Sequence, residues 1–313
     1  MSQKRKLRVL VILCILLIAA VSLSIWYLIS FAATSNNGRI LPSENFTNEN
    51  TLTYQDVNFN MHSTHALLIN LTAGEMIFEH HANTRVYPAS LTKMMTVLIG
   101  IEQSRSDTMI VRADFTRIML ANASVAGFEY GEERTLMEIL HGAMLPSGAD
   151  ATATIAYHVA GSYDAFVELM NERARELGMY HTNFTNTSGL HDENQYTTAY
   201  DMVILLKYAL ENPIFREVFT ARNYAFTTFF GEQRVMNSTL FVNMWTTEFT
   251  GGEMMGGRTG FTNAAGRCLA SLATNGTDEF ILITFGADPY AANQIAHISD
   301  ALMIYEYFLN AFE

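Results

Sequence analysis

The stretch PASLTK, at residues 88–93, places Ser90 and Lys93 three positions apart. Apolar residues then recur at helical spacing as far as Ile101, so we expect Ser90 at or near the N-terminus of a helix, with Lys93 one turn further on. Side chains at this spacing begin about 5 to 6 Å apart, so the amine can take the hydroxyl proton. The pattern alone is common on solvated helices, and other segments must support a catalytic reading.

The N-terminus has the composition of a membrane anchor. Basic residues fill the sequence KRKLR at 4–8, and residues 9–33 carry no charge. That run exceeds the roughly 18 to 20 residues that span a bilayer and the 7 to 15 of a signal-peptide core. We therefore predict a cytoplasmic tail at 1–8 and a transmembrane signal-anchor at 9–33, with the remainder outside the cytoplasm. A cleaved signal peptide is the alternative, because residues 30–32 are small enough for a cleavage site.

The charge of the chain disfavours nucleic-acid binding, and its cysteine content disfavours a fold stabilised by disulfides. The chain has 19 basic and 31 acidic residues, and four of the basic ones precede the predicted anchor. Such an acidic ectodomain has no basic patch to neutralise phosphates, so nucleic acid is not an expected partner. The two cysteines are Cys14, inside the anchor, and Cys268, so no intrachain disulfide is expected.

The rest of the chain reads as a flexible linker at 34–58, rich in Asn, Thr, Ser and Glu, followed by one domain at 59–313. We predict an α/β (α+β) domain in which strands at both ends of the sequence form one sheet and the helices between them form an inserted subdomain. A site is expected where the two halves meet. The predicted strands cover 65–69, 75–79, 268–273 and 280–285, with a turn at 275–276. The predicted helices cover 135–143, 162–177, 199–210 and 292–312, with another starting at 213.

Two further segments supply chemistry to the Ser90 region. MLPSGAD, at 144–150, places Ser147 on a loop between two helices. GGRTGFT, at 256–262, opens a strand whose glycines permit close approach of a ligand. A guanidinium and a hydroxyl in that second segment suit a substrate carboxylate, which guanidinium groups bind through two parallel hydrogen bonds.

The order of these three segments resembles that of penicillin-binding proteins and serine β-lactamases. Within that superfamily, residues 58–313 resemble the D-alanyl-D-alanine carboxypeptidases of low molecular mass. The segments that carry the resemblance are YPASLTKMMT (87–96), TNF (182–184), SGLHD (188–192), YTTAYDM (196–202) and TGFTNAAG (259–266). The resemblance implies a β-lactamase/transpeptidase-like fold, an antiparallel sheet flanked by helices.

The same resemblance implies an extracytoplasmic peptidase that removes the terminal D-alanine from the stem peptides of peptidoglycan. Ser90 would attack the penultimate D-alanine carbonyl and form an acyl-enzyme, and β-lactam antibiotics would acylate the same serine. Lys93 would take the serine proton, and Ser147 would pass a proton to the leaving D-alanine. No metal or other cofactor is implied.

The substrate-binding residues implied by the resemblance lie in the third segment. Arg258 and Thr259 would hold the terminal carboxylate of the substrate, and Gly260 would keep that strand close to the substrate. The backbone N–H groups of Ser90 and Phe261 would form the oxyanion hole, where one donor contributes roughly 3 to 4 kcal/mol in comparable sites.

Two departures from the family pattern keep alternatives open. Ala149 stands where the family has asparagine, and Arg258 stands where it has lysine. A catalytically weak, membrane-tethered protein that binds stem peptides is therefore one alternative. A β-lactamase-like hydrolase is a second alternative. The nine histidines, including His80, His81 and His158, are better explained as core or surface residues than as metal ligands, because no His-Glu-x-x-His helix occurs.

Overall fold

The computed structural model describes residues 46, 51–115, 123–228, 230–290 and 294–310, which all belong to one unit at 44–313. The predicted tail at 1–8 and membrane anchor at 9–33 lie outside these residues. Within the described ranges, no helix combines the length and the apolar character that crossing a bilayer requires.

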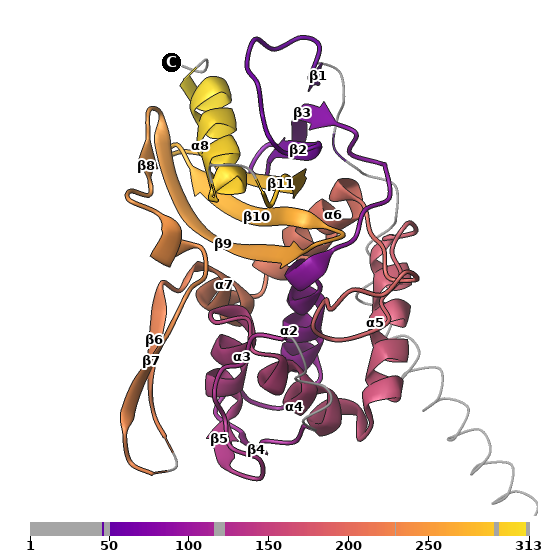
Figure 1. Cartoon of the computed structure of the whole chain (residues 1–313), viewed down its shortest axis with the longest axis vertical. Coiled ribbons are helices and arrows are strands. Elements are labelled where there is room, and N and C mark those ends of the chain that lie inside the picture. Colours follow the sequence, from indigo (N-terminus) through magenta and orange to yellow (C-terminus); the bar gives the residue numbers. More distant parts are fainter. Residues whose placement is uncertain (1–45, 47–50, 116–122, 229, 291–293, 311–313) are drawn as a thin grey trace, which may run out of the picture. The chain divides into compact units, whose positions relative to one another are not determined.

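A seven-stranded sheet forms the upper part of the domain (Figure 1). Strands from the two ends of the sequence meet at its centre, where β2 pairs with β11, so the sheet is closed by both ends of the domain, as predicted. In spatial order its strands are β1 (Leu52–Thr53), β3 (Glu75–His80), β2 (His65–Asn70), β11 (Glu279–Ala287), β10 (Gly266–Thr274), β9 (Gly252–Thr262) and β8 (Glu248–Phe249).

Both faces of this sheet are buried, which explains why its central strands are apolar at nearly every position. Alternate side chains of a strand point to opposite faces. In β2, Leu67 and Ile69 pack with the large group of helices, whereas Ala66 and Leu68 pack toward α8 (Ala296–Leu309). Figure 1 shows α8 on one face of the sheet and the other helices on the opposite side.

The helical part follows the capping signals of the sequence. Thr135 and Glu138 form the predicted capping box, in which the Thr135 hydroxyl accepts from the Glu138 N–H at 3.2 Å. Gly178 ends the helix that Ser162 begins, and Asn212 caps the helix that starts at proline. The helices are α2 (Lys93–Glu102), α3 (Leu136–Met144), α4 (Ala149–Ala160), α5 (Tyr163–Leu177), α6 (Ala199–Leu210) and α7 (Pro213–Thr220), and the 3-10 turns are η1 (Ala89–Thr92) and η2 (Phe241–Asn243).

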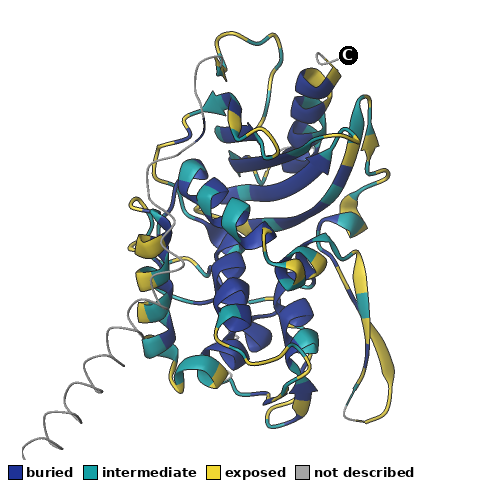
Figure 2. Cartoon of the chain, turned by 180° about the vertical axis from the view of Figure 1, so that it is seen from behind, coloured by how far each residue is buried: buried dark blue, intermediate teal, exposed yellow. Residues whose placement is uncertain are grey.

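Two small hairpins complete the fold. One pairs β4 (Ile110–Arg112) with β5 (Glu133–Thr135), and the other pairs β6 (Asn223–Thr227) with β7 (Gln233–Asn237). Figure 2 shows that the β6–β7 hairpin is mostly exposed, whereas the central helices and strands are buried.

The structure corrects the predicted sheet in two respects. The sheet is mixed and not purely antiparallel, because Leu52 and Thr53 run parallel to Phe78 and Glu79 at one edge. The sheet also begins inside the stretch 34–58 that composition predicted as linker. A strand of two residues is too short to give a period-two pattern, so its pairing is visible only in the folded chain. At the other end, α8 begins at Ala296, later than the predicted residue 292.

Candidate active site

Ser90 lies in η1, the 3-10 turn that leads directly into α2, so it sits at the helix start as the spacing predicts. The preceding residue, Ala89, has a φ of +46°, in the left-handed region that costs energy for a residue with a side chain. Two glycines from other segments pack closely against this turn, where a side chain would not fit. A Cβ on Gly189 would lie 1.8 Å from the Ala89 carbonyl oxygen, and one on Gly260 would lie 3.0 Å from the Ser90 nitrogen.

Lys93 is the first residue of α2, and its Nζ lies 3.2 Å from the Ser90 Oγ. The amine also donates to the backbone carbonyl of Ser188. Burial lowers the pKa of Lys93 well below its usual value, and the nearby positive charge of Arg258 lowers it further, while the Asp150 carboxylate partly offsets both effects. These surroundings favour the neutral amine that a general base requires.

Ser147 lies beside Ser90, with 3.1 Å between the two Oγ atoms. It is buried, and its φ of +72° is also left-handed. The two residues that follow Ser147 are held by backbone hydrogen bonds, because the Gly148 N–H donates to the Gly142 carbonyl at 2.9 Å and the Ala149 N–H donates to the Ser124 carbonyl at 2.8 Å. Backbone strain held in place in this way is typical of functional sites.

Arg258, in β9, is fully buried at 0% exposure, directly beneath the two serines. Its Nε donates to the Ser90 carbonyl at 3.3 Å, one Nη to the Met144 carbonyl at 2.7 Å, and the other Nη to the Ser147 Oγ. Burial lowers the pKa of Arg258 to about 9, which leaves the guanidinium charged at pH 7. All three of these contacts are within the protein, so the direct contact with a substrate carboxylate that the sequence predicts stays a prediction.

Of the other three predicted substrate-binding residues, Gly260 is buried, whereas Thr259 and Phe261 reach the surface. Thr259 is half-buried, and its hydroxyl lies 2.8 Å from the hydroxyl of Thr239. Gly260 lets β9 approach the nucleophile turn closely. Phe261 is 46% exposed and lies opposite Arg267 in the β9–β10 ladder, with the guanidinium carbon of Arg267 5.3 Å from its ring centre.

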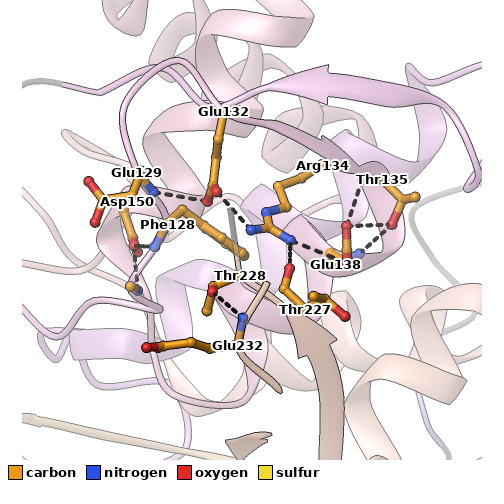
Figure 3. Close-up of polar contacts among 11 residues, drawn as sticks. Phe128, Glu129, Glu132, Arg134, Thr135, Glu138, Asp150, Thr227, Thr228 and Glu232 are labelled. Atoms are coloured by element: carbon orange, nitrogen blue, oxygen red, sulfur yellow. Dashed lines mark hydrogen bonds and ion pairs between the residues drawn. The ribbon is translucent and has the colours of Figure 1, made fainter. Parts of the chain in front are cut away.

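Asp150 is a buried residue of the site for which the sequence predicted no role. Its carboxylate accepts the backbone N–H groups of Ala126 and Gly127 at 2.8 Å and that of Phe128 at 3.1 Å. Figure 3 shows Asp150 with Phe128, near Arg134, whose side chain joins Glu132 to the Thr227 carbonyl. The carboxylate therefore fixes the loop that covers the Ser147 segment.

Three other contacts were also not predicted from the sequence, namely those of the Ser188 carbonyl, the Met144 carbonyl and the Thr239 hydroxyl. Backbone carbonyls leave no sequence signal, because every residue has one. Asp150 had a weak signal, as a lone acidic residue in the small apolar run ADATA.

Histidines gather away from this site. His65, His80 and His81 approach one another, with ring centres 4.1 Å apart for His80 and His81 and 5.9 Å apart for His65 and His81. In the part of the chain that the structure describes, no three His, Cys, Asp or Glu side chains are arranged to hold a metal ion. Cys268 is buried and unpaired in β10.

Comparison with known families adds to this geometry. Residues 48–289 match the family model described as D-alanyl-D-alanine carboxypeptidase. The chain belongs to this family. Among curated members, it is 34% identical to D-alanyl-D-alanine carboxypeptidase DacF of Bacillus subtilis over 71% of this chain and 57% of that protein. It is 30% identical to DacC of Escherichia coli over 71% of this chain and 56% of that protein.

Solved structures agree with the family assignment. The DD-transpeptidase of Streptomyces K15 is similar over 80% of this chain and 99% of its own, at 26% identity and a TM-score of 0.69. A D-alanyl-D-alanine carboxypeptidase of Mycobacterium tuberculosis covers 77% of this chain and 91% of its own, at 26% identity and a TM-score of 0.66. The predicted family and its fold of helices around a sheet are thus confirmed. The chain spans only about 57% of the length of the first curated relative.

Proposed function

We propose that this chain is a serine-type D-alanyl-D-alanine carboxypeptidase that removes the terminal D-alanine from peptidoglycan stem peptides. One observation carries the proposal. The amine of Lys93 lies 3.2 Å from the Ser90 hydroxyl, in surroundings that favour the neutral base, and the Ser147 hydroxyl lies 3.1 Å from the same atom. The family membership supports the choice of substrate.

In the proposed acylation step, the neutral Lys93 amine takes the proton of Ser90 as its Oγ attacks the penultimate D-alanine carbonyl carbon. The contact between the amine and the Ser188 carbonyl holds one N–H and keeps the side chain in place. The N–H groups of Ser90 and Phe261 donate to the oxyanion as negative charge develops. Preorganised donors of this kind supply much of the rate enhancement in acyl transfer.

The leaving nitrogen needs a proton when the peptide C–N bond breaks, and Ser147 supplies it. The Ser147 hydroxyl lies beside both Ser90 and the charged Arg258, which favours loss of its proton. Ser147 regains a proton from the Lys93 ammonium, which restores the base. Water then attacks the acyl-enzyme while Lys93 accepts a proton from it. As the ester C–O bond breaks, Lys93 returns that proton to the Ser90 Oγ, and the shortened peptide is released.

The same proposal includes β-lactams as acylating inhibitors and places the enzyme at the cell membrane. Its support is the cluster of basic residues at 4–8 before the uncharged stretch 9–33. In this topology the N-terminus is cytoplasmic and residues 59–313 face the peptidoglycan. Protease treatment of intact protoplasts should degrade the catalytic domain, and full protection of that domain would overturn the topology.

Labelling with a fluorescent penicillin tests the enzymatic proposal. The protein should form a covalent adduct, and mass spectrometry of peptides should locate it on Ser90. Ser90→Ala should abolish the label, with Ser104→Ala in the same chain as a control that keeps it. A wild-type protein that takes no label on Ser90 would contradict an acyl-enzyme mechanism.

Release of D-alanine from diacetyl-Lys-D-Ala-D-Ala distinguishes the remaining candidates. Ala149 and Arg258 depart from the family pattern, so a stem-peptide-binding protein without hydrolysis is the second candidate. A pure binder would release no D-alanine. A β-lactamase-like hydrolase would instead hydrolyse nitrocefin faster than the peptide.

A further inference from the structure

Thr239 lies between the second and third signature segments, although no sequence pattern marks it. Its backbone N–H donates to the Leu145 carbonyl at 3.1 Å, two residues before Ser147. Its carbonyl accepts from the Asn243 side chain at 2.8 Å. Because both backbone polar groups are bonded, the position of the Thr239 side chain relative to the Ser147 loop is fixed.

The hydroxyl of Thr239 meets the third segment. The Thr259 Oγ1 donates to the Thr239 Oγ1 at 2.8 Å, and both side chains are half-buried. A hydroxyl that accepts one hydrogen bond still has its own proton to donate. Within the described residues, the Thr239 hydroxyl has Thr259 as its only side-chain partner, so this proton is available to a ligand.

An anion at this position would need direct donors other than Arg258. That guanidinium is fully buried, and its contacts go to the Ser90 carbonyl, the Met144 carbonyl and the Ser147 hydroxyl. Its positive charge nevertheless attracts an anion to the neighbouring surface. A carboxylate oxygen accepts two hydrogen bonds or more. Each hydroxyl has one proton, so the pair donates two hydrogen bonds to a carboxylate only if the Thr259 hydroxyl turns from Thr239 to the ligand.

We propose that Thr239 binds the terminal carboxylate of the substrate together with Thr259, and so selects peptides with a free C-terminus. This inference rests on the proposed carboxypeptidase function. In this proposal the hydroxyls of Thr239 and Thr259 bind the carboxylate directly. The buried positive charge of Arg258 attracts the carboxylate without touching it. Thr239 is accordingly a residue of substrate specificity, and it takes no part in proton transfer.

The test compares acylating agents with and without a carboxylate. Thr239→Val keeps the shape of the side chain and removes the hydroxyl, and Thr239→Ser keeps the hydroxyl. The second-order rate of Ser90 acylation is measured with benzylpenicillin and with its methyl ester by intact-protein mass spectrometry. Loss of one hydrogen bond to a charged group predicts a fall of about tenfold to hundredfold for benzylpenicillin in Thr239→Val. With the methyl ester, Thr239→Val should react at a rate within about twofold of that of the wild-type protein with the same ester. Thr239→Ser should retain most of the wild-type rate with benzylpenicillin.

Peptide turnover supplies a second readout. For D-alanine release from diacetyl-Lys-D-Ala-D-Ala, Thr239→Val should raise KM more than it lowers kcat. If Thr239→Val lowered the acylation rate equally for benzylpenicillin and its ester, or lowered neither rate, the proposed role of Thr239 would be overturned. A wild-type protein that neither agent acylates would instead refute the proposed function itself, so the two failures are distinguishable.

Discussion

At the scale of single residues, the site brings two basic side chains, Lys93 and Arg258, under the same pair of serines. Two positive charges in a dry site repel each other, and the group that loses its proton more easily becomes neutral. A guanidinium holds its proton more tightly than an amine does. Arginine in place of the family lysine therefore keeps Lys93 in the form that a general base requires.

Replacing Arg258 with methionine should move the pH dependence of acylation. The charge of Arg258 lowers the pKa of Lys93, so its removal raises that pKa and shifts the acid limb of the rate profile to higher pH. At pH 7 the benzylpenicillin acylation rate should fall at least tenfold, and by no more than the roughly 10² to 10⁴ that a general base contributes in total. Arg258→Lys, which keeps a charge, should shift the limb less. An unmoved acid limb in Arg258→Met would contradict this coupling.

Gly189 provides a second prediction at this scale. Its φ is +86°, and an added Cβ would lie 1.8 Å from the Ala89 carbonyl oxygen, so the turn that holds Ser90 must shift. Gly189→Ala should destabilise the domain by about 2 to 4 kcal/mol in urea unfolding and slow Ser90 acylation. Gly161→Ala is the matched control, because Gly161 has a φ of +70° with no atom within 4 Å of the added Cβ. Equal losses in the two variants would mean that backbone strain alone, and not the contact with Ala89, explains the effect.

At the scale of elements, caps and turns follow directly from local sequence. Thr135 with Glu138, Gly178 and Asn212 mark helix ends where predicted, because each satisfies backbone groups of its own helix. Asp150 resembles such a first-turn acidic residue, yet its carboxylate accepts the N–H groups of residues 126–128. A contact 22 to 24 positions away along the chain has no local signature.

Asp150→Ala should therefore loosen the loop at 126–128. The loss of several charge-assisted hydrogen bonds predicts a free energy of unfolding lower by on the order of 3 kcal/mol. Hydrogen exchange should accelerate at the amides of Ala126, Gly127 and Phe128. Asp164→Asn, at the exposed first turn of α5, is the control and should change stability by less than about 0.5 kcal/mol. Protected amides at 126–128 in Asp150→Ala would count against the anchoring role.

At the scale of the whole molecule, histidines cluster where the residues before β2 meet the end of β3. His62, His65, His80 and His81 line one cavity of about 480 Å³. Burial lowers the pKa of His65 to about 4, and repulsion from His81 and His80 adds to the effect. Burial and His81 also lower the pKa of His80. The fold therefore favours the neutral imidazoles of His65 and His80.

Stability should consequently depend on pH below neutrality. A histidine whose pKa is lower in the folded state stabilises the fold fully above about pH 6.5, its unfolded value, and this contribution declines as pH falls toward 4. The Tm should fall between pH 7 and 5, and His65→Gln should flatten that slope. His158→Gln, at an exposed position of α4, is the control and should leave it unchanged. If the Tm of His65→Gln fell as steeply between pH 7 and 5 as that of the wild-type protein, His65 would not be the cause of the pH dependence.

The sequence by itself determined the family, four strands of the main sheet, most of the helices and the pairing of Ser90 with Lys93, because signature segments, helix caps, apolar periodicity and three-residue spacing are properties of neighbouring residues. Tertiary structure alone decided the rest. It buried Arg258 beneath both serines, brought Thr239 to Thr259 across 20 positions, and set Asp150 against a distant loop. These contacts join segments that are distant along the chain, so their geometry depends on how the sheet packs against the helices.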